Sequence, residues 1–121
     1  MKLQTINASE RFDNTSFSNE VIDGKSVPLQ TLFTCAACGE KVGFTKNHIE
    51  HRSRVSASNL SSHHQGVFDA HAKEHHIRTT GFLDWNCPRC TSPIRVYVEH
   101  WAGGRHGDSG VEIKYVVEPL Q

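Results

Sequence analysis

Two closely spaced pairs of cysteines constrain the fold of this chain more than any other feature of its sequence. Cys35 and Cys38 form one C-x-x-C pair, and Cys87 and Cys90 form a second. A structural zinc ion takes four soft ligands in a tetrahedron, with each sulfur about 2.3 Å from the metal. A tight turn between the two members of a pair presents two thiolates to one ion. The pattern therefore predicts one structural zinc ion that joins two distant segments of the chain.

A redox role is the alternative explanation for such cysteine pairs. A redox C-x-x-C normally precedes a helix in a β-α-β unit, whereas neither pair here is followed by a helical pattern. Residues 1–7 lack the apolar run of a secretory signal, and no stretch is apolar for long enough to span a bilayer. We therefore expect a cytoplasmic protein with no membrane partner, in which the thiols stay reduced and free to bind metal.

The overall composition agrees with a fold that relies on a metal. Hydrophobic residues make up 36% of the 121-residue chain, and the mean hydropathy is −0.50. A chain of this length with so few hydrophobic residues has a small core, and such chains often need a disulfide or a bound metal for stability. The chain has 13 basic and 13 acidic residues, whereas a general nucleic-acid binder usually carries a basic excess. Its neutral charge therefore favours a protein partner.

Local signals predict strands on both sides of each cysteine pair. Residues 29–34 and 40–44 read as short strands, which would place the first pair at a hairpin tip. An Asp-Gly turn within residues 21–27 predicts another hairpin. In the last third of the chain, alternation of side chains predicts a long C-terminal β-hairpin. The alternating sets are Ile94, Val96 and Val98 against Arg95, Tyr97 and Glu99, and the pattern repeats at Val111, Ile113, Tyr115 and Val117.

The other segments are predicted to be less regular. Residues 1–20 are polar and are expected to form a loose N-terminal arm. Residues 45–81 form a His-rich insertion, in which residues 45–62 are expected to be loop. A helix is predicted over residues 63–76. Its signals are Ser62 and Gln65 in capping-box spacing, with Val67, Phe68, His71 and His75 on one face.

The two cysteine knuckles with their flanking strands resemble the zinc ribbon superfamily. The resemblance covers residues 29–44 and 82–118 and departs from the usual spacing, because 48 residues separate Cys38 from Cys87. It implies one small α+β domain over residues 1–121, with antiparallel strands, a long C-terminal hairpin and an inserted helix. A site closed by four thiolates leaves no position for water or substrate, so this zinc would stabilise the fold rather than catalyse.

The histidines of the insertion are candidates for a second metal site. His71 and His75 are one helical turn apart and can meet one ion, and His64 lies seven residues before His71 on the same side. The alternative is that these histidines are partly buried or solvated side chains with no ligand.

An enzyme is the alternative to a binding protein. The order of Asn47-His48, Asn59, His71 and His75 resembles that of HNH nucleases. The resemblance implies His48 as general base, Asn59 as the residue that orients it, and His71 and His75 as ligands of a divalent metal. Two features depart from the family: Asn47 replaces an acidic residue or histidine, and the second cysteine pair follows the helix.

Two further features are candidate partner-binding surfaces. The glycine-rich loop of residues 103–110 carries Arg105, His106 and Asp108, and is similar in kind to the charged hairpin tips of zinc ribbons in transcription elongation factors. The alternative is an ordinary turn with solvated charges. Arg95, Tyr97 and Tyr115 would form a second surface if they were an exposed stripe, or would be ordinary cross-strand packing. Trp85 is expected to cover the zinc knuckle.

These observations favour a non-enzymatic zinc-ribbon binding module. We expect it to act as a small regulator or inhibitor that binds a protein, a nucleic acid or a nucleoprotein complex. The HNH-like nuclease is the enzymatic alternative.

Overall fold

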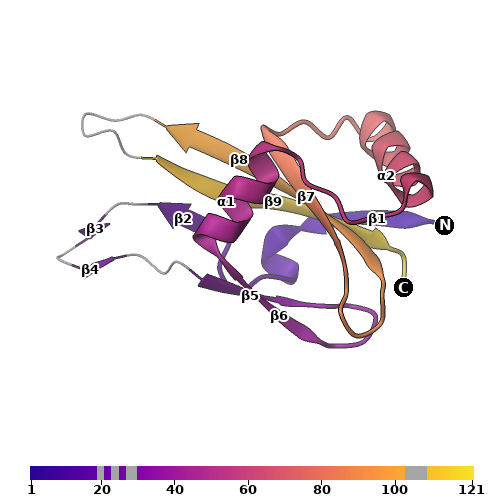
Figure 1. The fold of residues 1–121 in the computed structure, drawn as a ribbon, viewed down its shortest axis with the longest axis horizontal. Helices are drawn as coiled ribbons and strands as arrows, with labels where there is room; N and C mark the ends of the chain where they lie inside the picture. Colours follow the sequence, from indigo (N-terminus) through magenta and orange to yellow (C-terminus); the bar gives the residue numbers. More distant parts are fainter. Residues whose placement is uncertain (19–20, 23–24, 27–29, 103–108) are drawn as a thin grey trace.

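A computed structural model describes residues 1–18, 21–22, 25–26, 30–102 and 109–121 (Figure 1). No helix in these ranges has the length and apolar character needed to cross a bilayer. The strands are β1 (Leu3–Asn7), β2 (Ser16–Ser18), β3 (Val21–Ile22), β4 (Lys25–Ser26), β5 (Gln30–Thr34), β6 (Lys41–Thr45), β7 (Gly81–Asn86), β8 (Pro93–Ala102) and β9 (Ser109–Pro119), and the helices are the 3-10 turn η1 (Ala8–Glu10), α1 (Lys46–Arg54) and α2 (Ser62–Glu74).

A five-stranded antiparallel sheet forms the centre of the described fold. Its order is β1-β9-β8-β7, and β2 also pairs with β9. The hairpins β3–β4 and β5–β6 each form a separate two-stranded sheet. The α+β class and the long C-terminal hairpin, formed by β8 and β9, are confirmed. The hairpin predicted within residues 21–27 is present as the β3–β4 pair, although its turn residues lie outside the described ranges.

Both faces of the central sheet are covered. On one face, Val96 and Val98 of β8 pack in the larger core cluster with Phe33 of β5 and Ile49 of α1. On the other face, Tyr97 packs in a smaller cluster that also contains Leu60, Val117 and Phe68 of α2. The helices therefore lie on opposite sides of the sheet, with α1 and the β5–β6 hairpin on one side and α2 on the other.

A β-bulge interrupts the alternation of β9. Tyr97 pairs with Tyr115 but Val98 pairs with Ile113, so the register shifts between these two positions. An extra residue in one strand moves the following side chains to the opposite face. Val111, Ile113 and Val116 accordingly belong to the larger cluster and Val117 to the smaller one. The predicted single alternation through Tyr115 and Val117 is therefore wrong after Ile113.

The N-terminal segment is not the loose arm that its composition predicts. β1 pairs with β9 from Leu3 opposite Pro119 to Asn7 opposite Tyr115, and β2 pairs with β9 nearer its start. Arg11 adds a bidentate ion pair, with Nε and Nη2 each 2.8 Å from an oxygen of Glu118, which is buried. The long edge of β9 supplies these partners, and it is distant in sequence from residues 1–18.

The segment of residues 45–62 was expected to be loop, and this prediction is also wrong because it contains α1. The Thr45 hydroxyl caps the helix by accepting from the His48 N–H at 3.1 Å. Glu50, which is half-buried, forms i,i+4 ion pairs with half-buried Lys46 and exposed Arg54. Ile49 is the only large apolar residue that α1 buries, so the helix has little of the periodic pattern by which helices are recognised.

The predicted second helix is present as α2 and begins one residue earlier than expected. Ser61, not Ser62, is the N-cap, because its hydroxyl accepts from the His64 N–H at 3.2 Å. The Gln65 side chain reaches back to the Leu60 carbonyl at 2.8 Å. Phe68 is fully buried and anchors the helix to the sheet.

The Arg95 guanidinium holds α2 to the sheet. Its Nε and Nη2 donate to the two carboxylate oxygens of buried Asp84 at 2.7 and 3.0 Å, and its Nη1 donates to Asp69 of α2 at 2.6 Å. The charged group also lies 4.0 Å from the centroid of the Phe82 ring. Arg95 is 2% exposed and Tyr97 is 5% exposed. The predicted exposed stripe is therefore wrong for both residues, because α2 covers that face.

Replacing Arg95 with methionine should lower the free energy of unfolding by about 3–5 kcal/mol, because the buried Asp84 carboxylate loses its partner. Urea denaturation followed by far-UV circular dichroism measures this change. Arg78, which is exposed, provides the matched control, and its replacement with methionine should cost less than about 0.5 kcal/mol. Equal effects of the two substitutions would contradict the role given to Arg95.

Candidate metal centre

Both cysteine pairs lie at hairpin tips, as the sequence predicts. Cys35 and Cys38 occupy the turn between β5 and β6, and Cys87 and Cys90 occupy the turn between β7 and β8. The two turns share one hydrogen-bonding pattern. In the first turn, Cys35 N–H donates to Glu40 O at 2.9 Å and Gly39 N–H donates to Cys35 O at 2.8 Å; in the second, Cys87 N–H donates to Ser92 O at 2.9 Å and Thr91 N–H donates to Cys87 O at 2.8 Å.

The residue after the second cysteine of each pair has a left-handed backbone. Gly39 has φ of 79° and Thr91 has φ of 62°. Glycine adopts this conformation readily, whereas a β-branched residue does so at a cost. Thr91 Oγ1 donates to the Cys90 carbonyl at 2.6 Å, which helps to hold the turn. Thr91 and Gly39 occupy the same position of the two C-x-x-C turns, but a threonine, unlike a glycine, gives no local sequence signal for this conformation.

The four sulfurs form one compact group. All of them lie within 4.8 Å of one another, and all four cysteines are free thiols. Cys35 Sγ lies 3.7 Å from Cys90 Sγ, and Cys38 Sγ lies 3.6 Å from Cys87 Sγ. Sulfurs at about 2.3 Å from a central zinc ion stand about 3.8 Å apart along a tetrahedron edge. A disulfide would bring a pair to about 2.05 Å. The spacing of these sulfurs is compatible with a site in which four thiolates hold one metal ion.

The electrostatics of this group favour a bound cation. Burial raises the pKa of the Cys35 thiol to about 12. Burial also opposes ionisation of Cys87, but the N–H groups of Cys90 and Arg89 and the neighbouring thiols outweigh it and lower its pKa to about 7. Backbone N–H groups thus point at the sulfurs, as expected for a knuckle. Thiolates that are brought together in a partly buried site repel one another and lose contact with water. A divalent cation at their centre would offset this unfavourable free energy.

Three aromatic side chains pack together between the two hairpins that carry the cysteines. Trp85 packs between Phe33 and Phe44, with ring centroids 5.1 and 4.8 Å away. The three rings belong to the same buried cluster as Cys35 and Cys87. The metal site is therefore continuous with the larger core, and Trp85 joins the β5–β6 hairpin to the central sheet.

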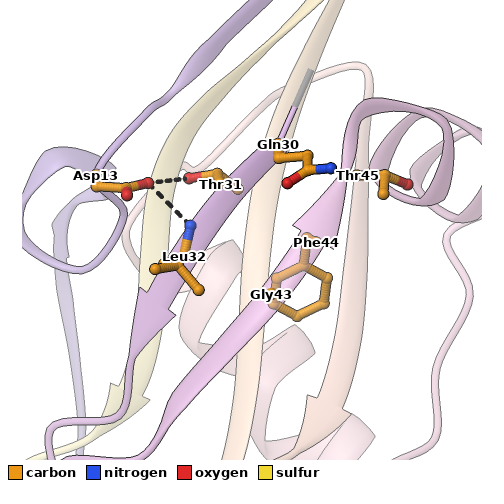
Figure 2. A pocket seen from close by; sticks show the side chains of 7 residues that line it. All are labelled: Asp13, Gln30, Thr31, Leu32, Gly43, Phe44 and Thr45. Carbon is orange, nitrogen blue, oxygen red and sulfur yellow. Dashed lines mark hydrogen bonds between the residues drawn. The ribbon is translucent and has the colours of Figure 1, made fainter. Parts of the chain in front are cut away.

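A hollow of about 370 Å³ lies on the β5–β6 hairpin, and Figure 2 shows the side chains that line it. The Asp13 carboxylate accepts from the Leu32 N–H at 2.8 Å and from the Thr31 hydroxyl at 3.0 Å. These two donors lower the pKa of Asp13, the Leu32 N–H more strongly. The lining consists of Asp13, Gln30, Thr31, Leu32, Gly43, Phe44 and Thr45. It includes none of the residues that the sequence marks as candidate catalytic groups or metal ligands.

The histidines do not assemble into either of the predicted sites. His48 lies on α1, where it packs edge-on against Phe44, whereas His71 lies on α2 and His75 is its C-cap residue, on the other side of the sheet. The backbone carbonyl of Asn59 accepts from the Asn86 side-chain amide at 3.2 Å, which places Asn59 beside β7. Within the described ranges, the four cysteines are the only group of three or more potential ligands close enough to share an ion. Neither the nuclease set nor a site that includes His64 is formed.

The remaining candidates for partner binding differ in what the structure shows. Arg105, His106 and Asp108 lie outside the described residues. Arg95 and Tyr97 are buried, as noted above, and of the proposed stripe only Tyr115 is exposed, at 37%.

Comparisons with protein-family models, with curated proteins and with solved structures found no match for this chain. The assignment of the site therefore rests on the geometry of its own residues.

Alanine substitutions at two glycines test the left-handed backbone of the first C-x-x-C turn. Gly39 has this backbone, and Gly66 is the control in an ordinary helical position. An added Cβ meets nothing within 4 Å at Gly39 or at Gly66, which lies inside α2. Gly39→Ala should lower the free energy of unfolding by about 1 kcal/mol, because only its backbone conformation opposes a side chain. Gly66→Ala should raise it by up to about 1 kcal/mol through helix propensity. Chemical denaturation measures both, and effects of the same sign would contradict the assigned turn.

Proposed function

We propose that Cys35, Cys38, Cys87 and Cys90 bind one zinc ion as thiolates and that this ion is structural. The observation that carries the proposal is the cross-hairpin sulfur spacing of 3.6 and 3.7 Å. Four soft, negatively charged ligands in a tetrahedral arrangement favour zinc over hard cations such as Mg²⁺ and Ca²⁺. Because four thiolates fill the coordination sphere, no position remains for a substrate or an activated water.

The position of the ion explains why the fold would need it. The β5–β6 hairpin forms its own two-stranded sheet, and β7 and β8 belong to the central sheet. An isolated two-stranded hairpin is marginally stable in water. The hairpin is held by aromatic packing on one side and by the shared metal at its tip, so the zinc would fix the angle between the two sheets.

We infer that the protein acts as a non-enzymatic binding module, a small regulator or inhibitor of a protein or nucleoprotein complex. The closed metal site and the dispersed histidines support a binding role over the nuclease alternative. A reduced compartment such as the cytoplasm would suit free thiolates. The partner would engage the end of the molecule where the β3–β4 hairpin and the far ends of β8 and β9 project in Figure 1.

An exposed tryptophan supports the choice of that end. Trp101 lies near the end of β8 opposite Gly110 of β9 and is 39% exposed. A Cβ on Gly110 would lie 2.4 Å from the Trp101 ring, so the absence of a side chain there lets the indole lie on the strand. Rigid aromatic side chains are enriched at the energetic centres of interfaces. Arg105, His106 and Asp108 follow Trp101 in the chain and are also proposed to contact the partner, on the evidence of the sequence alone.

Removal of the metal tests the structural role of zinc. A high-affinity chelator under reducing conditions should abolish the near-UV circular dichroism of Trp85 and Tyr97, because metal binding supplies on the order of 10 kcal/mol of apparent folding free energy in small zinc domains. Added Zn²⁺ should restore the signal, and added Mg²⁺ should not. A spectrum that stays native after complete removal of metal would refute the proposal.

The binding role is tested separately from the metal. Wild-type protein and the variants Trp101→Ala and Arg105→Ala would be compared in affinity capture from the source cells, with quantitative mass spectrometry. Tyr115→Ala, which removes another partly exposed aromatic residue, is the matched control. A partner should be reduced at least tenfold with the first two variants and unchanged with the control, at constant melting temperature. Equal recovery with all four proteins would refute the assigned surface.

Two assays separate the nucleic-acid and nuclease alternatives. Fluorescence anisotropy with duplex DNA and with RNA at about 50 and 200 mM salt detects phosphate-dominated binding, which weakens steeply with salt. Absence of binding at low salt would exclude nucleic acid as the direct partner. Plasmid nicking with Mg²⁺, Mn²⁺ or Ni²⁺ tests the enzyme, and nicking that is lost in His48→Ala would overturn the non-enzymatic role.

A further inference from the structure

We propose that His71 and His75 form a second, exchangeable metal site where α2 meets β1, for a divalent transition metal of the class of Ni²⁺, Cu²⁺ and Zn²⁺. This site is separate from the cysteine centre and does not depend on its function. It also differs from the predicted set that included His64, because the additional contact comes from Thr5.

The first observation is the geometry of the two imidazoles. Their ring centroids lie 4.3 Å apart with an angle of 39° between the ring planes. The His75 N–H donates to the His71 carbonyl at 3.0 Å, so the helical turn between them is intact. A metal ion binds imidazole nitrogens at about 2.0–2.1 Å, and side chains four residues apart are neighbours on one face of a helix. The backbone has thus already brought two ligands together.

The second observation is a hydrogen bond that orients one of the rings. Thr5 Oγ1 lies 2.7 Å from Nε2 of His71 and comes from β1, 66 positions away in the chain. Imidazoles that bind metals generally donate their other ring N–H to an oxygen, which fixes the tautomer. When Nε2–H donates to the Thr5 hydroxyl, Nδ1 of His71 keeps its lone pair for a metal. Thr5 is therefore a positioning residue rather than a ligand.

The third observation is that solvent and ions can reach the pair. A hollow of about 470 Å³ is lined by both histidines, by Glu74 and by residues at the two ends of the chain, including Lys2. A second hollow of about 310 Å³ borders Thr5 and the other side of His75. The Glu74 carboxylate adds negative charge beside the histidines and opposes the charge of Lys2. Water would fill the coordination positions that the imidazoles leave open.

The donor set determines the class of metal. Neutral imidazoles suit Cu²⁺, Ni²⁺ and Zn²⁺, whereas Mg²⁺ and Ca²⁺ require oxygen ligands. Affinity should follow the order Cu²⁺ > Ni²⁺ and Cu²⁺ > Zn²⁺. Two protein ligands with open positions give an exchangeable site, unlike the closed four-thiolate centre. Because Thr5 belongs to β1, metal occupancy would fasten the last turn of α2 to the edge of the sheet.

Isothermal titration of the zinc-loaded 121-residue protein with Ni²⁺ tests the proposal. We expect one additional site per chain, an affinity at least tenfold lower in His71→Ala and in His75→Ala, and no binding of Mg²⁺. His63→Ala and His64→Ala are matched controls on the first turn of α2 and should bind as the wild type does. Thr5→Val should weaken binding about tenfold. This is the smaller end of the range seen when a residue that hydrogen-bonds to a metal ligand is replaced.

Hydrogen exchange supplies a second readout, since Ni²⁺ should slow exchange at the C-terminal turn of α2 in the wild type but not in His75→Ala. Far-UV circular dichroism checks that each variant is folded, and His75 is exposed, so its replacement should leave the fold intact. Three results would overturn the proposal: no additional site, equal loss of affinity in His64→Ala and His75→Ala, or a thiolate-to-nickel absorption band showing that Ni²⁺ had entered the cysteine centre.

Discussion

The convergence of four sulfurs from two hairpins is the interaction on which the rest of this structure depends. Each hairpin supplies two thiols from a tight turn, and sulfurs of one hairpin lie 3.6 and 3.7 Å from sulfurs of the other. An ion at their centre would therefore cross-link segments that are 48 residues apart in sequence, between Cys38 and Cys87. Such a link limits the freedom of the unfolded chain and compensates for a small apolar core.

The central sheet is covered by different elements on its two faces. On the side of the larger core, Phe33 and Phe44 of the β5–β6 hairpin pack against Trp85 of β7. On the other side, α2 is held by Phe68 and by the ion pairs of Arg95. This division explains why the histidines of α1 and α2 do not meet. It also leaves the far ends of β8 and β9 as the region where side chains such as Trp101 reach solvent.

The sequence predicted those features whose signals are local. The cysteine pairs, their position at hairpin tips, the long C-terminal hairpin and most of α2 each depend on a short pattern of residues. The features that it missed depend on distant partners. β1 forms because β9 offers an edge to it, and the polar helix α1 buries little more than Ile49. Arg95 reads as a solvent-facing residue of an alternating strand, and only the presence of Asp84 and α2 shows that it is buried.

X-ray absorption at the zinc edge, together with native mass spectrometry of the protein as purified, tests the central claim most directly. We predict a tightly held zinc ion in every chain, bound by four sulfurs at about 2.3 Å. A weakly held second ion would be removed by dialysis before the measurement. A folded protein with no metal, or with its thiols joined as disulfides, would contradict the account.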